Sequence, residues 1–220
     1  MSGLATSPTL EEALEGLYAS PPQPLPFAPA LHVRAFLLRR ARGNLLIYSA
    51  PKLAAAAVAD LGGVARRYLN HGHEAMFMPD GIEAPLFVHA GDRRAVAEAA
   101  PVRAAFSRRH TLDEDFEVIP IPGHTPGATA YLWDAGSRRF LFTGDTIYLS
   151  GGEWAAAVLA SSDRAAYVES LELIRGLDFD VLVPWAAGAG EPPIALTDRA
   201  ETERRIDAIL TRVRRGAGRW

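Results

Sequence analysis

Apolar and polar positions alternate in blocks along the first half of the chain. The apolar runs Leu31–Leu38 and Asn44–Ser49 are separated by the polar turn Arg39–Gly43, and this pattern predicts a β-hairpin. The alanine-rich segment Lys52–Leu61 then predicts a helix, which Gly62–Gly63 ends.

Strand and helix patterns continue to alternate after this helix. Val64–Asn70 and Pro85–Ala90 are short apolar runs that predict strands. The segment from Asp92 to Ala100 predicts a further helix. Such alternation is typical of an α/β domain, and we expect one domain over residues 1–220.

The second half begins with three apolar runs that predict strands, at Phe116–Pro122, Ala128–Trp133 and Phe140–Thr143. A helix is expected at Asp163–Arg175 with Ser162 as its N-cap, and another at Asp198–Arg214 with Thr197 as its N-cap. The apolar run Val181–Pro184 between them predicts a buried strand.

The N-terminal segment predicts a short helix and an extended lead-in. Ser7 and Pro8 suit an N-cap and a first helical position, and residues from Thr9 to Glu12 fit a capping box. The proline-rich run Ser20–Pro29 predicts an extended linker or edge segment.

The composition is that of an ordinary globular protein and limits the partners. Of the 220 residues, 49% are hydrophobic and 22% are charged. The net charge of −3 gives no sign of polyanion binding, so no nucleic-acid partner is expected. No apolar stretch approaches about 20 residues, so no membrane span is expected. Neither the small-molecule substrate nor the oligomeric state follows from the sequence.

The chain contains no cysteine. This excludes disulfides, thiolate metal sites and a cysteine nucleophile, and it fits a reducing compartment. Residues 1–5 show no signal-peptide pattern, so we expect a cytoplasmic protein. The many alanines and arginines indicate a GC-rich genome, and we expect a bacterial protein.

Two histidines, His71 and His73, follow the strand predicted at 64–70. At a strand end, residues two apart share a face, so both imidazoles can reach one metal ion. Taken alone, such a pair is more often two solvated loop histidines. Ala75 and Met76 supply no hard ligand for a second ion, so the segment predicts half of a two-metal site.

Two further strand ends carry candidate ligands. The run Pro122-Gly123-His124-Thr125-Pro126-Gly127 fixes a tight loop that presents His124 rigidly, although an ordinary turn would also fit. Asp145 follows the strand at 140–143, where a carboxylate serves either as a metal ligand or as a cap. Both lie where sites of α/β folds gather.

Together these motifs are far more specific than each alone. A strand followed by His-x-His, a strand followed by Gly-His-Thr-Pro-Gly and a strand followed by Thr-Gly-Asp, in this order, resemble the metallo-β-lactamase superfamily. The resemblance spans about residues 31–190 and is strongest to the glyoxalase II and persulfide dioxygenase branches. It implies an α/β protein with a four-layer αββα sandwich and a site along one edge of two packed sheets.

The resemblance assigns roles residue by residue. His71 and His73 match the first two histidines of the family motif H-x-H-x-D-H, while Ala75 replaces its aspartate and Met76 its last histidine. His124 matches the next ligand, and Asp145 the carboxylate that bridges two metals in the family.

Two other family positions are also changed. Ala186 lies where a late histidine is expected, and Tyr48 lies where an aspartate follows the second hairpin strand. The chain therefore resembles a divergent member with a partly lost site.

The resemblance implies a metal-dependent hydrolase of the ester or thioester class with one tightly bound zinc ion, and no second metal is expected. Its metal ligands would be His71, His73, His124 and Asp145, with Asp145 and Glu74 as the catalytic groups. The set His71, His124 and Asp145 also fits an iron-dependent oxygenase of sulfur compounds. A non-catalytic binding module with a vestigial site is the third alternative.

The remaining candidates are weaker. His32 and His110 have no motif around them and predict surface or structural roles. His89 ends a predicted strand near the expected cleft, and Trp154 follows Asp145 on a loop that would wall a pocket or simply pack.

Overall fold

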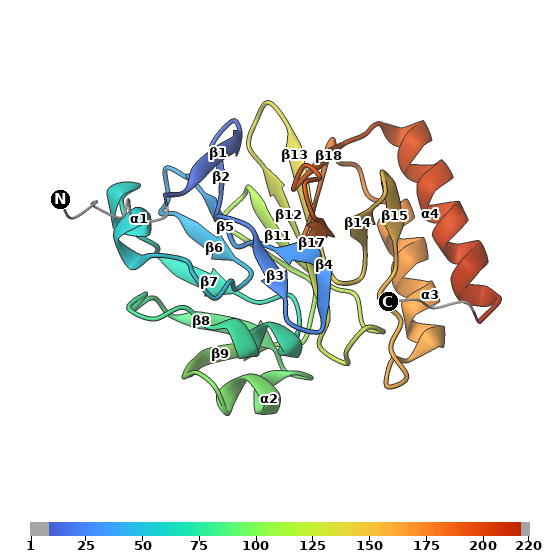
Figure 1. Cartoon of the computed structure of the whole chain (residues 1–220), viewed down its shortest axis with the longest axis horizontal. Helices are drawn as coiled ribbons and strands as arrows, with labels where there is room; N and C mark the ends of the chain where they lie inside the picture. Colours follow the sequence, from blue (N-terminus) through green and yellow to red (C-terminus); the bar gives the residue numbers. More distant parts are fainter. Residues whose placement is uncertain (1–8, 217–220) are drawn as a thin grey trace.

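The computed structural model describes residues 9–216 and arranges the strands of this range in three sheets (Figure 1). The seven-stranded sheet has the order β1 (Glu11–Leu14), β2 (Leu17–Ala19), β5 (Phe36–Leu38), β6 (Leu45–Ile47), β7 (Arg66–Tyr68), β8 (Leu86–His89) and β9 (Val102–Phe106). The six-stranded sheet has the order β10 (His110–Leu112), β11 (Phe116–Pro120), β12 (Thr129–Asp134), β13 (Arg139–Gly144), β16 (Val181–Pro184) and β18 (Ala195–Leu196).

A third, five-stranded sheet completes the architecture. Its order is β15 (Glu153–Ala155), β14 (Tyr148–Ser150), β17 (Ala186–Gly188), β4 (Ala28–Val33) and β3 (Gln23–Leu25). The helices are α1 (Ala55–Asp60), α2 (Arg93–Ala97), α3 (Arg164–Arg175) and α4 (Arg199–Arg214), with a 3₁₀ helix at Gly72–Phe77. None of the helices within residues 9–216 is long and apolar enough to cross a membrane.

The layers follow from the alternation of side chains along each strand. On β13, Phe140 and Phe142 face the core between the seven-stranded and six-stranded sheets, whereas Leu141 faces the core beneath α3 and α4. On β6, Leu46 faces outward, toward Val58 of α1. Helices therefore cover the outer faces of the seven-stranded and six-stranded sheets, which is the αββα sandwich expected from the sequence (Figure 1).

Most predicted elements are present, and the differences are local. The strand over residues 181–184 has the predicted bounds, and β5 pairs with β6 as the expected hairpin. The run 31–38 is divided, because β4 and β5 belong to different sheets. The N-caps of α3 and α4 are Asp163 and Asp198, each one residue after the predicted cap, and each side chain accepts a backbone N–H.

The predicted N-terminal helix is wrong over its described part. Residues Glu11–Leu14 form β1, which turns back through Gly16 (φ +77°) and pairs with β2. Pairing of β1 with β2, which in turn pairs with β5, outweighs the helix preference of this segment. Ser7 and Pro8 lie outside the described residues. The proline-rich run at 20–29 was expected to form an extended linker or an edge segment. It contributes the edge strand β3.

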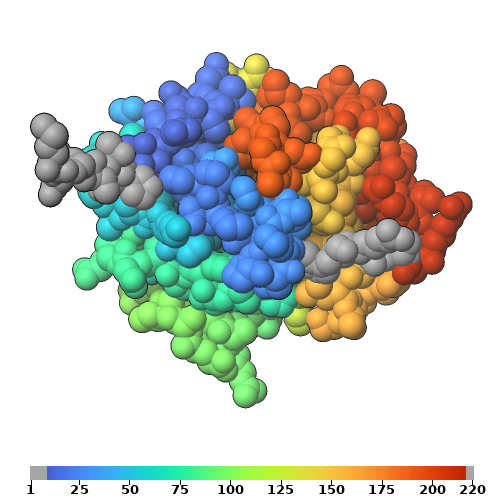
Figure 2. Space-filling model, viewed as in Figure 1, coloured from blue at the N-terminus to red at the C-terminus, as the bar shows by residue number. Residues whose placement is uncertain are grey.

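The topology gathers several strand ends at one edge. β13 and β16 are parallel neighbours, and β11 points the same way because β12 is antiparallel to both β11 and β13. The space-filling view shows the N-terminal part of the described chain, in blue, from the upper edge to the middle of one face, with green parts below it and orange parts to its right (Figure 2).

Candidate metal centre

Three histidines converge beyond the carboxyl ends of β7 and β11. His71 and His73 follow β7, and His124 follows β11. One candidate ligand atom of each lies within 4.8 Å of those of the other two. The first two histidines lie at the start of the 3₁₀ helix rather than on a strand, since β7 ends at Tyr68. The loop therefore brings their rings together, with centroids 5.3 Å apart.

The partners of His71 determine which of its nitrogens is available to a metal. Its Nδ1 lies 3.2 Å from Glu74 Oε1 and 3.0 Å from the Asn70 side-chain oxygen. Both partners accept hydrogen bonds, so we place the hydrogen on Nδ1. The buried Nε2 has no hydrogen-bond partner. A histidine held in this way through its other nitrogen is a typical metal ligand.

His124 is oriented by the same principle. Its Nδ1 lies 2.7 Å from the carbonyl oxygen of Ala157, which can only accept, so Nδ1 carries the hydrogen and Nε2 presents its lone pair. His73 Nδ1 lies 3.1 Å from His124 Nε2. Two imidazole nitrogens at this distance must share either a proton or a cation.

Asp145, at the end of β13, adds a carboxylate. Its Oδ2 lies 3.4 Å from His71 Nε2 and 3.6 Å from His124 Nε2. Its Oδ1 is buried without a hydrogen-bond partner. Buried polar atoms without partners are uncommon in proteins. Two of them, Asp145 Oδ1 and His71 Nε2, belong to this one cluster, so the residues present fit a divalent cation.

The cluster holds one proton tightly. Burial opposes a charge on His71, but Asp145 and Glu74 outweigh it and raise the pKa of this imidazole to about 10. Burial and the charge of His71 lower the pKa of His124 to about 4, and burial lowers that of His73. Asp145 is buried too, yet the charge of His71 lowers its pKa. A metal ion that binds here must displace the proton of His71.

Glu74 is fully buried, and its carboxylate bonds to the backbone. Oε1 accepts from the N–H groups of Asn70 (2.7 Å) and His71 (3.1 Å), and Oε2 accepts from that of Ser49 (3.0 Å). Burial raises the pKa of this carboxyl despite these bonds. The side chain thus faces Nδ1 of His71, on the opposite side of the ring from Asp145.

Asp92 ties the two histidine loops together. Its Oδ2 accepts from Gly72 N–H (2.8 Å) and from the hydroxyl of Thr125 (2.6 Å), and its Oδ1 accepts from Gly127 N–H (3.1 Å). Gly127 packs so closely that an added Cβ would lie 2.6 Å from the Asp92 carboxyl carbon. One buried carboxylate therefore sets the spacing between the His71–His73 loop and the His124 loop.

Tyr48 joins the two large sheets behind the site. Its hydroxyl donates to the carbonyl oxygen of Val183 (2.7 Å) and accepts from Gly144 N–H (2.8 Å). Its φ of 66° is left-handed, which is uncommon for an aromatic residue. The position that carries an aspartate in the family thus has a structural role here.

A cavity of about 340 Å³ opens beside the cluster. The six lining residues are Phe27, His73, Met76, Asp145, Leu159 and Trp185. Trp185 is buried, donates its indole N–H to the Ser49 carbonyl oxygen (2.8 Å) and meets the His71 ring edge-on at 5.2 Å. Ala186, the position of the family's late histidine, is buried next to it.

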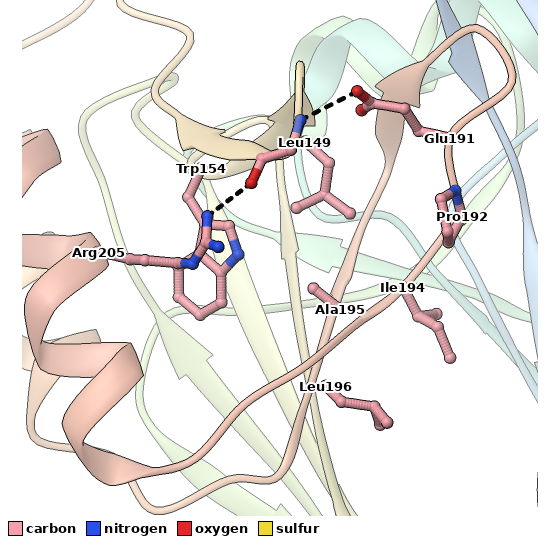
Figure 3. Close-up of a pocket in the computed structure, with 9 residues that line it drawn as sticks. Leu149, Trp154, Glu191, Pro192, Ile194, Ala195, Leu196 and Arg205 are labelled. Carbon is pink, nitrogen blue, oxygen red and sulfur yellow. Dashed lines mark hydrogen bonds between the residues drawn. The ribbon is translucent and has the colours of Figure 1, made fainter.

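The weaker candidates lie away from this cavity. His89 accepts from Gly91 N–H and packs on Phe106. Trp154 lines a different pocket of about 220 Å³, between β14, β15, α4 and the segment 191–196 (Figure 3). At this pocket Arg205 donates to the carbonyl oxygen of Gly152, and the N–H of Gly152 donates to Glu191.

Several site residues carry no motif that would reveal them in the sequence. Asp92 appears only as the start of a predicted helix, and Asn70 only as the residue before His71. Trp185 follows a buried strand and is one of four tryptophans. Their roles arise from contacts between segments distant in the chain.

A sequence comparison places the chain in a known family. The family model described as Metallo-beta-lactamase superfamily matches residues 52–186, more than half of the chain. No curated protein matches the chain significantly in sequence.

Solved structures of low sequence identity share the fold. BJP-1, a subclass B3 metallo-beta-lactamase of Bradyrhizobium japonicum, has a TM-score of 0.64 at 13% identity, with 98% of this chain and 97% of that chain covered. A metallo-beta-lactamase from Erythrobacter litoralis has a TM-score of 0.69 at 15% identity, covering 94% and 97%. The archaeal superfamily protein ST1585 from Sulfolobus tokodaii has a TM-score of 0.60 at 17% identity, covering 89% and 86%.

Proposed function

The chain belongs to the metallo-beta-lactamase superfamily, and from this premise we propose that it is a metal-dependent hydrolase of the ester or thioester class. One zinc ion would be held by His71, His73 and His124. The observation that carries the proposal is the convergence of their ligand atoms within 4.8 Å, beside the unpartnered Asp145 Oδ1.

The three histidines suit zinc, because neutral imidazole nitrogens are among its preferred ligands and a catalytic site keeps a fourth position open. When bound, zinc would lower the pKa of a water molecule and polarise a carbonyl group. No second metal is expected, because Ala75 and Met76 offer no hard ligand.

Asp145 and Glu74 take different roles in this proposal. Asp145 Oδ1 has no hydrogen-bond partner, so it is available to orient a water molecule and accept its proton. The oxygens of Glu74 already accept from three backbone N–H groups. Glu74 therefore acts through His71, which it orients, as a positioning residue.

One observation favours iron-dependent oxygen chemistry as a second candidate. Asp145 Oδ2 lies within 3.6 Å of both His71 Nε2 and His124 Nε2, the arrangement of two histidines and one carboxylate that suits Fe(II). Metal content of protein purified without added metal separates the two candidates, since iron as the bound metal supports the oxygenase.

The test of the hydrolase is reconstitution. Chelator-treated protein should regain cleavage of p-nitrophenyl butyrate and a butyryl thioester on addition of one equivalent of zinc. Asp145→Asn should lower kcat by about a hundredfold or more while zinc stays bound through the histidines. Cleavage that proceeds equally without metal, or that survives His124→Ala, would overturn the proposal.

A further inference from the structure

The cavity beside the metal centre has two different halves. His73 and Asp145 supply the polar half. The other four lining residues, Phe27, Met76, Leu159 and Trp185, are apolar. A volume of about 340 Å³ lies at the small end of the usual range for small-molecule sites.

Exposed apolar side chains gather at this cavity. Within residues 9–216, the large hydrophobic residues that are strongly exposed are Phe27 (61%), Met76 (59%) and Leu196 (62%). Two of these three line the same cavity, although they come from segments about 50 residues apart. Exposed apolar surface around a concave site indicates ligand contact. Methionine suits this role because its flexible thioether adapts to different shapes.

The charges of the side chains that line the cavity also favour an uncharged ligand. None of the six residues that line the cavity in the described chain is a lysine or arginine, and Asp145 is the carboxylate among them. A negatively charged substituent against the apolar wall would lose its hydration without gaining a cationic side chain. An uncharged substituent avoids this cost.

We infer that the substrate presents an uncharged, apolar acyl group to this wall, and that Met76 is the specificity-determining residue. This inference rests on the proposed hydrolase function, because it names the substrate of that reaction. The position that lacks a second-metal ligand then serves as substrate contact.

Binding of two matched anilides tests the inference without turnover. N-phenylbutanamide is uncharged, and N-phenylsuccinamic acid carries a carboxylate at the end of a chain of similar length. Ligand-observed NMR titration would measure both dissociation constants on metal-free and zinc-loaded protein. The metal-free measurement separates contact with the wall from direct binding of the carboxylate to zinc.

We expect the uncharged anilide to bind about tenfold or more tightly in the metal-free protein. Met76→Lys should reduce the ratio of the two dissociation constants by roughly tenfold, because the added cation of the wall strengthens binding of the acid. Met76→Leu should keep the preference. Leu196→Lys is the matched control, since Leu196 is equally exposed but lines the other pocket (Figure 3).

Equal or tighter binding of the acid by metal-free wild-type protein would overturn the inference. The inference would also be overturned if Met76→Lys left the preference for the uncharged anilide unchanged, or if Leu196→Lys abolished it. Because the readout is binding, a protein that shows this preference but hydrolyses no ester would refute the proposed hydrolase function alone.

Discussion

Glu74 Oε1 lies 3.2 Å from Nδ1 of His71, while Asp145 Oδ2 lies 3.4 Å from Nε2 of the same ring. His71 is thus held between a carboxylate that is bonded to the backbone and one that faces the cavity. Glu74 fixes the orientation of the ring through Nδ1, and Asp145 lies beside Nε2. Glu74 thus bonds to the backbone through both of its oxygens, whereas Asp145 Oδ1 has no hydrogen-bond partner.

Glu74→Gln should weaken zinc binding by about ten- to a hundredfold, the range found when the carboxylate partner of a metal-bound histidine is lost. The amide keeps the size of the side chain but can no longer stabilise His71 as an anion does. Competition with a chromophoric chelator measures the affinity, and the exposed Glu98→Gln is the control. Unchanged affinity would mean that Glu74 serves the fold alone.

Asp92→Asn should lower the free energy of unfolding by about 1–3 kcal/mol, because an amide N–H₂ would face groups that now donate to Asp92. It should also weaken zinc binding, because the two histidine loops lose their shared acceptor. Urea unfolding and chelator competition measure the two effects. The exposed Asp80→Asn should leave both unchanged, and an equally stable Asp92→Asn with normal zinc affinity would contradict this role.

Gly144→Ala should destabilise the protein more than Gly152→Ala. Both glycines have left-handed backbones, with φ of +56° and +75°. A Cβ at Gly144 would lie 1.8 Å from the side-chain oxygen of Asn70, whereas nothing lies within 4 Å of a Cβ at Gly152.

The difference between these two variants isolates the steric effect from the backbone cost that both share. Displacement of Asn70 should also disturb its contact with His71, so Gly144→Ala should lose zinc affinity as well as thermal stability. Equal melting temperatures for the two variants would show that Asn70 moves aside without cost.

The stability of metal-free protein should fall as the pH rises from about 6.5 toward 10. The folded pKa of His71, about 10, is above its ordinary value of 6.5. A raised pKa stabilises the folded state fully below the unfolded value, and this contribution disappears as the pH passes through the folded value.

Urea unfolding at several pH values measures this dependence. Asp145→Asn should flatten the curve, because it removes the largest charge interaction that favours protonated His71. A variant with the same slope as the wild-type protein would assign the pH dependence to other groups.

Local signals predicted much of the fold. The alternating apolar runs indicated the hairpin of β5 and β6 and the three strands of the second half, because each strand buries alternate residues in two cores. The N-terminal helix was wrong, since strand pairing outweighed the local preference of Glu11–Leu14. The short strands β14, β15 and β17 were missed, because their pairing partners supply most of their definition.

The candidate ligands were easier to find in the sequence than the residues that hold them. His124 lies in a loop whose glycines and prolines are visible in the sequence, and His71 and His73 form a recognisable pair. Asp92, by contrast, is defined by bonds to residues 20 and 33–35 positions away. The role of Glu74 was also hidden, because it depends on which backbone groups the fold brings to its carboxylate.

Metal content tests the account most directly. Protein purified without added metal, then saturated with zinc and freed of excess, should contain one equivalent by mass spectrometry, and His71→Ala and His124→Ala should each contain far less while remaining folded by circular dichroism. Two tightly bound equivalents, or one equivalent that both variants retain, would contradict a single ion held by His71, His73 and His124.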